Sequence, residues 1–269
     1  MSTVTELPVE DLDDALEGSI GDFKSNSLWR LTLRRLFKQR SAIIGGIMIA
    51  ILIFVAIFAD VIAPHDPNED FIGVENVKKR QGPCIHLLGC PEDHPQHIMG
   101  TDGNVRDEFS RLIHGTRRSL FIGFFTVGLA ILVGAFLGAI AGYAGGWLDN
   151  LVMRVLDVVL AFPFLILAIA IVQVLGPGLY KAMLAIAIVS IPAYARVTRS
   201  SVLAVRGHSY VEASRALGAS DFQILRGRIL PNALPPLIVI ATLGIATAIL
   251  ETAALSFLGL GAQPPEPEW

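Results

Sequence analysis

The chain has 269 residues, of which 53% are hydrophobic and 17% are charged, and its formal net charge is −3. Its mean hydropathy is +0.59, whereas soluble domains carry roughly 25% charged residues. The charges gather in the N-terminal tail, in loops and in one polar hairpin, and long uncharged runs separate them. This distribution excludes an ordinary soluble domain and predicts an all-α integral membrane protein whose helix lengths are set by the bilayer.

The N-terminal part of the chain is expected to change from an acidic tail to a membrane helix. Residues 1–28 are acidic and poor in large apolar side chains, which is typical of a disordered tail. Residues 29–40, WRLTLRRLFKQR, can place apolar and basic side chains on opposite faces, which predicts an amphipathic helix at the membrane interface. Residues 41–63 form the first predicted span, with no charge before Asp60. Five basic residues precede this span, so the tail is expected in the cytoplasm.

Residues 64–118 are polar and are predicted to lie outside the cytoplasm. They contain both cysteines of the chain, Cys84 and Cys90, which are close enough in sequence for a disulfide-closed loop outside the reducing cytoplasm. Free thiols and a metal site formed with neighbouring histidines are the alternatives, although this spacing matches no standard zinc finger. The histidines are His86, His94 and His97. We expect the disulfide and no metal.

Residues 119–258 are predicted to form the transmembrane core, with spans at about 119–143, 151–175, 179–197 and 235–258. Gly134, Gly138 and Gly142 are four residues apart, so they line one face of a helix and permit close packing against a neighbour. Pro192 lies inside the fourth span, where we expect a kink.

Several ionisable or polar residues lie in or near these spans. Glu251 and Gln173 are deep enough to line a pathway or to pack between helices, and the sequence leaves both readings open. Asp149, Arg154 and Asp157 lie near the start of the third span, where structural pairing, for example between Arg154 and Asp157, is favoured over a direct role in transport.

The polar hairpin covers residues 209–232. Ser209 with Glu212, and Ser220 with Gln223, have the spacing of a capping box, so each pair is predicted to start a helix. Gly218 can take the left-handed conformation that ends the first of these helices. Pro231 is expected to end the second.

This hairpin carries a resemblance to a known family. The order Glu212-Ala213-Ser214, then Gly218, then Leu230-Pro231 resembles the EAA cytoplasmic loop of ABC-importer permeases. The longer run EASRALGAS…ILPN is similar to the dipeptide/oligopeptide (peptide/nickel) branch, "C"-type subunit. Ser214 stands where the general motif has a second Ala, and Arg228 where it has Ile. In that family the loop forms a coupling helix in a cleft of the ATP-binding subunit, which the resemblance here assigns to Glu212, Ala213, Ser214, Arg215, Ala216, Leu217, Gly218 and Ala219.

The resemblance implies the type I ABC-importer permease bundle with six spans. Five spans are visible here, and residues 259–269 resemble the extracytoplasmic loop before the sixth, so the chain reads as truncated and a sixth span is expected beyond its C-terminus. Four spans separate the hairpin from the N-terminus, so both are expected in the cytoplasm. The arginines around the hairpin agree with that side. Three arginines at the outer edge of the second span point the other way: Arg111, Arg117 and Arg118.

The resemblance also implies the function and the partners. The chain is expected to be the permease of an ATP-driven importer of di- or oligopeptides in the cytoplasmic membrane, with nickel or glutathione as the alternative cargo. It lacks a GxxxxGK[ST] phosphate loop, so we expect no enzyme here and place ATP and Mg on separate ATPase subunits. A second permease, by the resemblance a "B"-type paralogue, an extracytoplasmic substrate-binding protein and membrane lipid are the other expected partners.

Two functions of other classes remain open, and neither involves binding to nucleic acid. An ion-gradient-driven secondary transporter would need intramembrane carboxylates, of which only Glu251 fits, and usually repeated halves. A non-transporting membrane scaffold would only recruit a cytoplasmic protein. No basic stripe interleaved with aromatic residues suggests nucleic acid.

Overall fold

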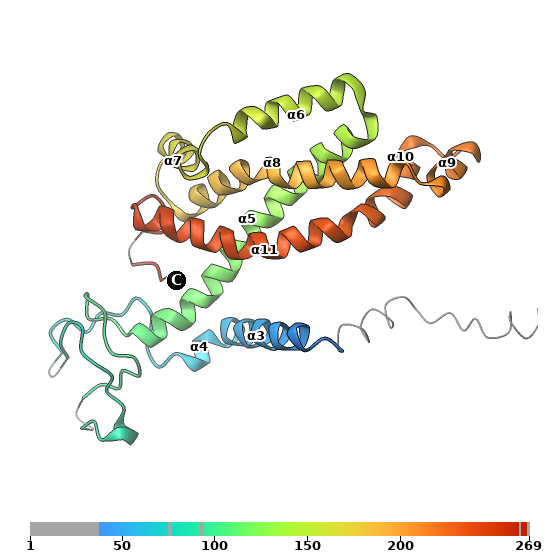
Figure 1. The fold of residues 1–269 in the computed structure, drawn as a ribbon. Helices are drawn as coiled ribbons and strands as arrows, with labels where there is room; N and C mark the ends of the chain where they lie inside the picture. Colours follow the sequence, from blue (N-terminus) through green and yellow to red (C-terminus); the bar gives the residue numbers. More distant parts are fainter. Residues whose placement is uncertain (1–37, 75–76, 92–93, 264, 268–269) are drawn as a thin grey trace, which may run out of the picture. The chain divides into compact units, whose positions relative to one another are not determined.

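The computed structural model describes residues 38–74, 77–91, 94–263 and 265–267. Across these residues every regular element is helical, and β pairing is limited to two isolated bridges (Figure 1). The predicted tail at 1–28 and most of the predicted interfacial helix at 29–40 lie outside the described residues. The elements in order are α3 (Arg40–Ile57), α4 (Ala59–Ile62), the 3₁₀ helix η1 (His86–Leu88), α5 (Glu108–Ala144), α6 (Gly146–Leu160), α7 (Phe164–Leu175), α8 (Leu179–Arg206), α9 (Ser209–Ala216), α10 (Asp221–Ile224), η2 (Leu225–Ile229, a π-helix) and α11 (Leu230–Phe257).

The chain divides into two units, 1–54 and 55–269. The described part of the first unit is most of α3, an apolar helix in which no residue up to Phe54 is buried. A hydrophobic helix that leaves its side chains exposed in this way is suited to lipid and not to water. The first predicted span, residues 41–63, is divided in the structure between α3 and the short helix α4.

The core of the second unit is built on close packing between α5 and α8. A Cβ added to Gly134 would lie 2.8 Å from Ile191 O, and one added to Gly142 would lie 2.9 Å from Arg199 O. At Gly138 it would overlap the carbonyl of Ala195. These three glycines therefore let the two backbones approach each other, as their spacing predicted.

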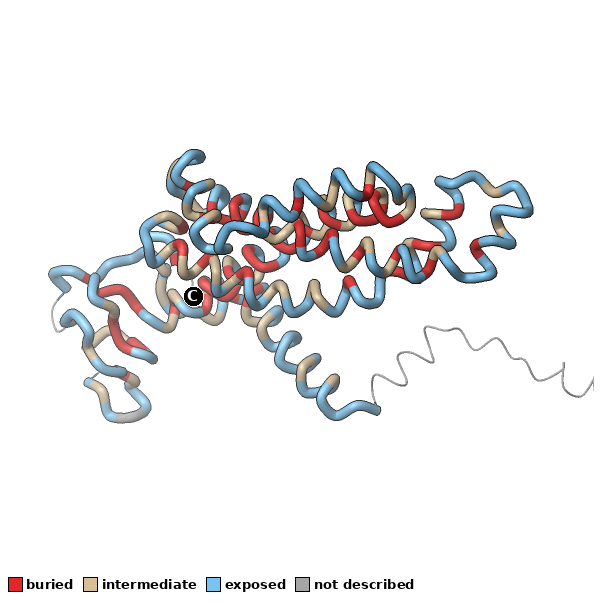
Figure 2. Tube along the Cα trace, turned by 45° about the horizontal axis from the view of Figure 1, so that its top comes forward, coloured by how far each residue is buried: buried red, intermediate tan, exposed pale blue. Residues whose placement is uncertain are grey.

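The helix α11 completes the core by packing on both α5 and α8 (Figure 1). Val127 of α5, Tyr194 of α8 and Leu237 of α11 share one buried cluster. Buried residues are concentrated where these helices meet, while the outward faces are exposed (Figure 2). Those outward faces carry large apolar side chains such as Phe136 and Leu243, which is the arrangement expected of helices that face lipid.

The predicted third span is not one straight helix. It is divided into α6 and α7, which meet at an angle of 90°. Pro163 precedes α7, and a proline disfavours helical conformation at the residue before it, which here is Phe162. Within the described part of the chain, four helices are long and apolar enough to cross a membrane, or five if this bent pair counts as one span.

The helix α8 runs through Pro192, which is buried, and extends to Arg206, beyond the predicted end of the fourth span at 197. Membrane helices tolerate an internal proline when neighbouring helices support the freed backbone groups. In α8 the neighbour at this level is α5, because the Gly134 contact is with Ile191.

The segment at 64–107, which was predicted to be extracytoplasmic, is tied to the start of α5. Cys84 and Cys90 form a disulfide, which leaves no thiolate for the alternative metal site. The backbone of Cys84 pairs with that of His97 in one of the two isolated bridges. The buried His97 ring contacts Asp107 Oδ1 at 3.0 Å, and Asp107 Oδ2 accepts a hydrogen bond from Ser110 N at 2.7 Å. Asp107 is thus the N-cap of α5, which begins at Glu108, well before the predicted span.

Candidate functional site

The polar hairpin forms one end of the helical core (Figure 1). It consists of α9, a turn at residues 217–220, α10 and the π-helix η2, which runs on into α11. The turn depends on Gly218, whose φ is +83°. A Cβ at Gly218 would meet no heavy atom within 4 Å, so glycine is needed for backbone conformation and not for space.

One of the two predicted capping boxes is confirmed. Ser220 is the N-cap of α10, Gln223 Oε1 accepts from Ser220 N at 3.0 Å, and Ser220 Oγ accepts from Gln223 N at 3.4 Å. The prediction for Ser209 and Glu212 is wrong. The N-cap of α9 is His208, which has extended backbone and no side-chain cap bond, so Ser209 is already the first helical residue.

Pro231 does not end the second helix of the hairpin, contrary to the prediction. The chain stays helical from Asp221 to Phe257, and Pro231 lies in the first turn of α11. A proline inside a regular helix clashes with the carbonyl four residues before it. Here the π-helix η2 comes just before, and Leu230 N–H bonds to Leu225 O, five residues back. This wider turn accommodates the proline ring, so α10, η2 and α11 form one continuous helical segment.

The sequence-predicted residues form the outer surface of the hairpin. Leu217 is 88% exposed, and Phe222, which the sequence interpretation overlooked, is 68% exposed. Two exposed large apolar side chains on a polar hairpin indicate a surface made for a partner. Six of the predicted residues are exposed and Ser214 and Ala219 are half-buried; the exposed ones are Glu212, Ala213, Arg215, Ala216, Leu217 and Gly218.

The opposite side of the hairpin is anchored in the core. Val211 of α9, Ile224 of α10 and Ile229 of η2 are fully buried in one cluster. The same cluster contains Ala139 of α5 and Val202 of α8. Ala233 of α11 also belongs to it, so α9 is packed through this cluster against all three core helices.

Polar contacts centred on Tyr143, near the end of α5, reinforce this anchoring. Its hydroxyl group donates to Asp221 and accepts from Arg215 Nη2 at 3.4 Å. Its carbonyl accepts from Arg206 Nη1 at 2.8 Å. The hydrogen bond with Tyr143 raises the pKa of Arg215, which is charged at physiological pH in any case. Tyr143 could not be identified from the sequence, because its partners are more than 60 residues away along the chain.

The carboxylates near the start of the third span pair with α8 and not within their own helix. Asp157 accepts from Arg196 at 2.5 Å, and Asp149 binds Arg199. The expected pairing of Arg154 with Asp157 is therefore replaced by a contact between helices.

The two pathway candidates lie away from the hairpin, on different helices. Gln173 is exposed on α7, and Glu251 is half-buried on α11. Their roles remain predictions.

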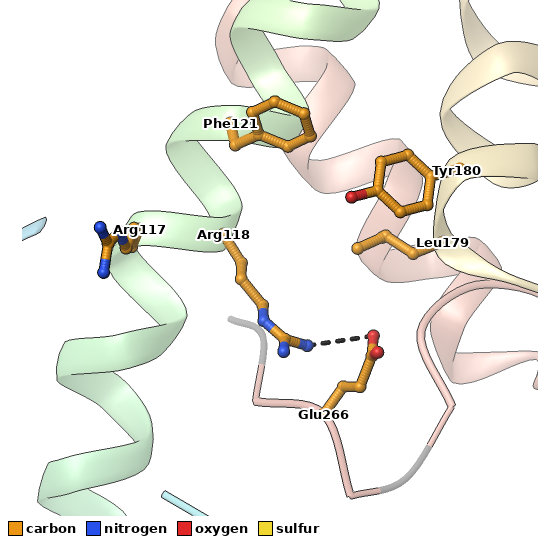
Figure 3. A pocket seen from close by; sticks show the side chains of 6 residues that line it. All are labelled: Arg117, Arg118, Phe121, Leu179, Tyr180 and Glu266. Carbon is orange, nitrogen blue, oxygen red and sulfur yellow. Dashed lines mark ion pairs between the residues drawn. The ribbon is translucent and has the colours of Figure 1, made fainter.

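A cavity of about 330 Å³ is lined by residues of α5, of the start of α8 and of the C-terminal loop (Figure 3). Arg118 on α5 points into it and pairs with Glu266 at 3.0 Å, and Phe121 and Tyr180 line it. Arg117 pairs instead with Asp60 of α4 at 3.6 Å. Arg117 and Arg118, near the start of α5, thus both have anionic partners.

Two known protein families match large parts of this chain. Residues 134–269 match the family described as "Binding-protein-dependent transport system inner membrane component". Residues 27–83 match "N-terminal TM domain of oligopeptide transport permease C". Together these matches include α3, the hairpin and α11.

Curated relatives cover most of the chain. The dipeptide transport system permease protein DppC of Alkalihalophilus pseudofirmus is 45% identical over 90% of this chain and 75% of its own length. The di/tripeptide permease DppC of Pseudomonas aeruginosa is 45% identical over 87% of this chain and 75% of its own length. The glutathione permease GsiD of Pectobacterium atrosepticum is 39% identical over 93% of this chain and 79% of its own length.

A solved structure shares the fold of the core. The inward-facing MetNI methionine ABC transporter, in its native crystal form, aligns with a TM-score of 0.52 and 26% identity, over 57% of this chain and 77% of that one. The predicted type I permease fold is therefore confirmed. The chain belongs to the family of binding-protein-dependent transport system inner membrane components, as a "C"-type permease subunit of an ABC transporter.

Proposed function

We propose that this chain carries di- or oligopeptides through the cytoplasmic membrane as one permease of an ATP-driven importer. The observation that carries the proposal is the hairpin, which exposes Leu217 and Phe222 while burying Val211, Ile224 and Ile229 in the core. The named relatives transport dipeptides, di- and tripeptides or glutathione, which is itself a short peptide. Peptides are therefore the first choice of cargo, with glutathione next; nickel has no support among these relatives.

The coupling mechanism follows from the anchoring of α9. An ATPase subunit binds the exposed face of α9 and moves it when ATP, bound with Mg, closes the ATPase pair. The buried cluster passes this motion to α5, α8 and α11, which alternately open the pathway to each side. Hydrolysis belongs to the ATPase, because this sequence has no phosphate loop.

The orientation and the remaining partners complete the proposal. The hairpin and the N-terminus face the cytoplasm, and the disulfide-containing segment faces the substrate-binding protein, in a compartment where disulfides persist. A second permease, a "B"-type paralogue, supplies the other half of the pathway. An ion-driven secondary transporter is less well supported, because such a protein has no use for a rigidly anchored, partner-facing hairpin.

Reconstituted transport tests this function. The four kinds of subunit are placed in proteoliposomes, and ATP-dependent uptake of a labelled dipeptide is measured for the wild type and for Leu217→Asp. We expect the variant to lose both uptake and ATPase binding, because a carboxylate replaces an exposed apolar contact. Leu87→Asp, at an equally exposed leucine of η1, is the control and should bind the ATPase normally.

Two results would contradict the proposal. Dipeptide uptake that proceeds without any ATPase, driven by an ion gradient, would favour the secondary transporter. Wild-type membranes that bind the ATPase but never accumulate peptide would favour the scaffold.

A further inference from the structure

The cavity of about 330 Å³ in Figure 3 lies where α5, α8 and the C-terminal loop meet. Tyr180 belongs to the first turn of α8, a helix of 28 residues whose last residue, Arg206, comes just before the hairpin. On the proposed orientation, the cavity is therefore on the extracytoplasmic side, where the cargo arrives. Its volume falls in the range of roughly 300–1,000 Å³ that small-molecule sites occupy.

The C-terminal loop is held against both helices, which gives the cavity a defined wall. Gly178 N, at the start of α8, donates to Leu260 O at 3.1 Å. Arg111 Nη1, on α5, donates to Pro265 O at 3.0 Å. The next residue is Glu266, and its carboxylate points into the cavity (Figure 3).

Arg118 and Glu266 form a weakly held pair of opposite charges across this cavity. Arg118 Nη1 lies 3.0 Å from Glu266 Oε2, and the two side chains are 37% and 44% exposed. Within the described part of the chain, this buried Nη1 has no hydrogen-bond partner, so the contact is not aligned as a hydrogen bond. An exposed ion pair contributes little to stability, whereas a buried donor without an acceptor is costly. The guanidinium therefore favours a carboxylate that approaches it in line.

Two aromatic rings provide the apolar part of the cavity. The ring centroids of Phe121 and Tyr180 are 6.3 Å apart in an edge-on arrangement, and both side chains are exposed. Such rings give contact area to apolar side chains of different sizes. The cavity thus combines one cation, one anion and an aromatic surface. A lone metal ion or a neutral ligand would leave at least one of the two charges unmatched.

We propose that this cavity is a subsite for a zwitterionic dipeptide, whose terminal carboxylate binds Arg118 and whose terminal ammonium group binds Glu266. The inference rests on the proposed function and deepens it, because it names two residues that recognise the cargo at the entrance. Two residues of extended chain span at most about 7 Å, so both ends of a dipeptide fit within one cavity of this size. The peptide's two charges replace the weak contact between Arg118 and Glu266, and its side chains lie on Phe121 and Tyr180.

Binding of end-blocked peptides tests the subsite. The full-length chain, with its partner permease and the ATPase subunits, is placed in phosphatidylcholine nanodiscs without the substrate-binding protein, so that only the membrane complex can select the peptide. Dissociation constants are measured by calorimetry for alanyl-phenylalanine, for its C-terminal amide and for its N-acetyl derivative. We expect each blocked form to bind about tenfold more weakly than the free dipeptide, because each leaves one charged group without its partner.

Two variants should give a crossed pattern. Arg118→Gln should weaken binding of the free dipeptide about tenfold and remove its advantage over the amide, while its advantage over the N-acetyl form remains. Glu266→Gln should remove the advantage over the N-acetyl form and keep the advantage over the amide. A variant that had only lost its fold would weaken all three peptides equally, and that result for both variants would overturn the subsite.

Lys181→Gln is the matched control. It removes one positive charge from an exposed residue next to Tyr180 that does not line the cavity. This variant should bind all three peptides as the wild type does. If it weakens binding of the free dipeptide as much as Arg118→Gln, the attraction is a general effect of charge and the subsite is rejected.

The outcomes also separate the subsite from the function on which it rests. ATP-dependent uptake of alanyl-phenylalanine is measured in proteoliposomes that contain all four kinds of subunit. If the wild type accumulates the dipeptide but binds its free, amidated and acetylated forms alike, the subsite is wrong and the permease function stands. If the wild type does not accumulate the dipeptide with ATP, the proposed function itself fails.

Discussion

Arg199 of α8 binds the carboxylate of Asp149 of α6 through two hydrogen bonds, Nε to Oδ1 at 2.5 Å and Nη2 to Oδ2 at 2.6 Å. Asp149 is only 8% exposed, so its charge depends on this guanidinium. A two-pronged contact of this kind fixes orientation as well as distance. The contact holds α6, the first half of the bent α6–α7 pair, against α8, the helix on which α5 also packs.

Replacing Arg199 with Gln should destabilise the protein by about 1–3 kcal/mol, because it leaves a poorly solvated carboxylate without its counter-charge. The arginine is one-third exposed, which keeps the cost at the lower end. Thermal unfolding in detergent measures the loss. Asp149→Asn in the same background should recover part of it, and two strictly additive single effects would show that the pair is not coupled.

The second prediction concerns the close packing of α5 on α8. Gly138→Ala should cost about 1–3 kcal/mol, because the new methyl group overlaps the carbonyl of Ala195 and forces the helices apart. Gly128→Ala on the same helix is the control, since its Cβ would meet nothing within 4 Å. Equal unfolding temperatures for the two variants would contradict the packing argument.

The third prediction concerns the left-handed turn at Gly218. A β-branched residue at φ +83° is strained by about 1–2 kcal/mol, so Gly218→Val should change the angle between α9 and α10 while the spans stay folded. In the reconstituted transporter, ATP hydrolysis should continue with much less peptide taken up per ATP. Gly218→Asn is the control, because asparagine tolerates the left-handed region. Normal transport by the valine variant would count against the coupling role of this turn.

Local features of the hairpin could be predicted from the sequence because they depend on neighbouring residues. Ser220 and Gln223 bond to each other, and Gly218 supplies the left-handed turn. The prediction for Ser209 failed because two residues compete for the same N-cap position. His208 takes it, and its ring contacts Ala204 O at 3.0 Å, at the end of α8. The capping-box spacing of Ser209 and Glu212 does not take account of this contact between His208 and the preceding helix.

The parts of the structure that the sequence did not predict depend on distant residues or on a rare helix type. Asp149 and Arg199 are 50 residues apart, so hydropathy alone could not pair them. The 90° bend at Pro163 interrupts a run that is apolar on both sides. The π-helix at Leu225–Ile229 has no sequence signature of its own, so the passage of Pro231 into α11 could not be anticipated.

The last prediction concerns the Cys84–Cys90 disulfide and distinguishes the local stability of its segment from ATPase binding at the hairpin. Replacing Cys90 with Ser opens a short loop, and loss of its closure should destabilise this segment by about 2–3 kcal/mol. Hydrogen exchange should then accelerate at the amides of Cys84 and His97, which bond to each other's carbonyls across the bridge. ATPase binding at the hairpin should not change, because the hairpin is anchored by a different buried cluster. Unchanged exchange at Cys84 and His97 would show that the backbone bridge, and not the disulfide, holds this segment on the N-terminus of α5.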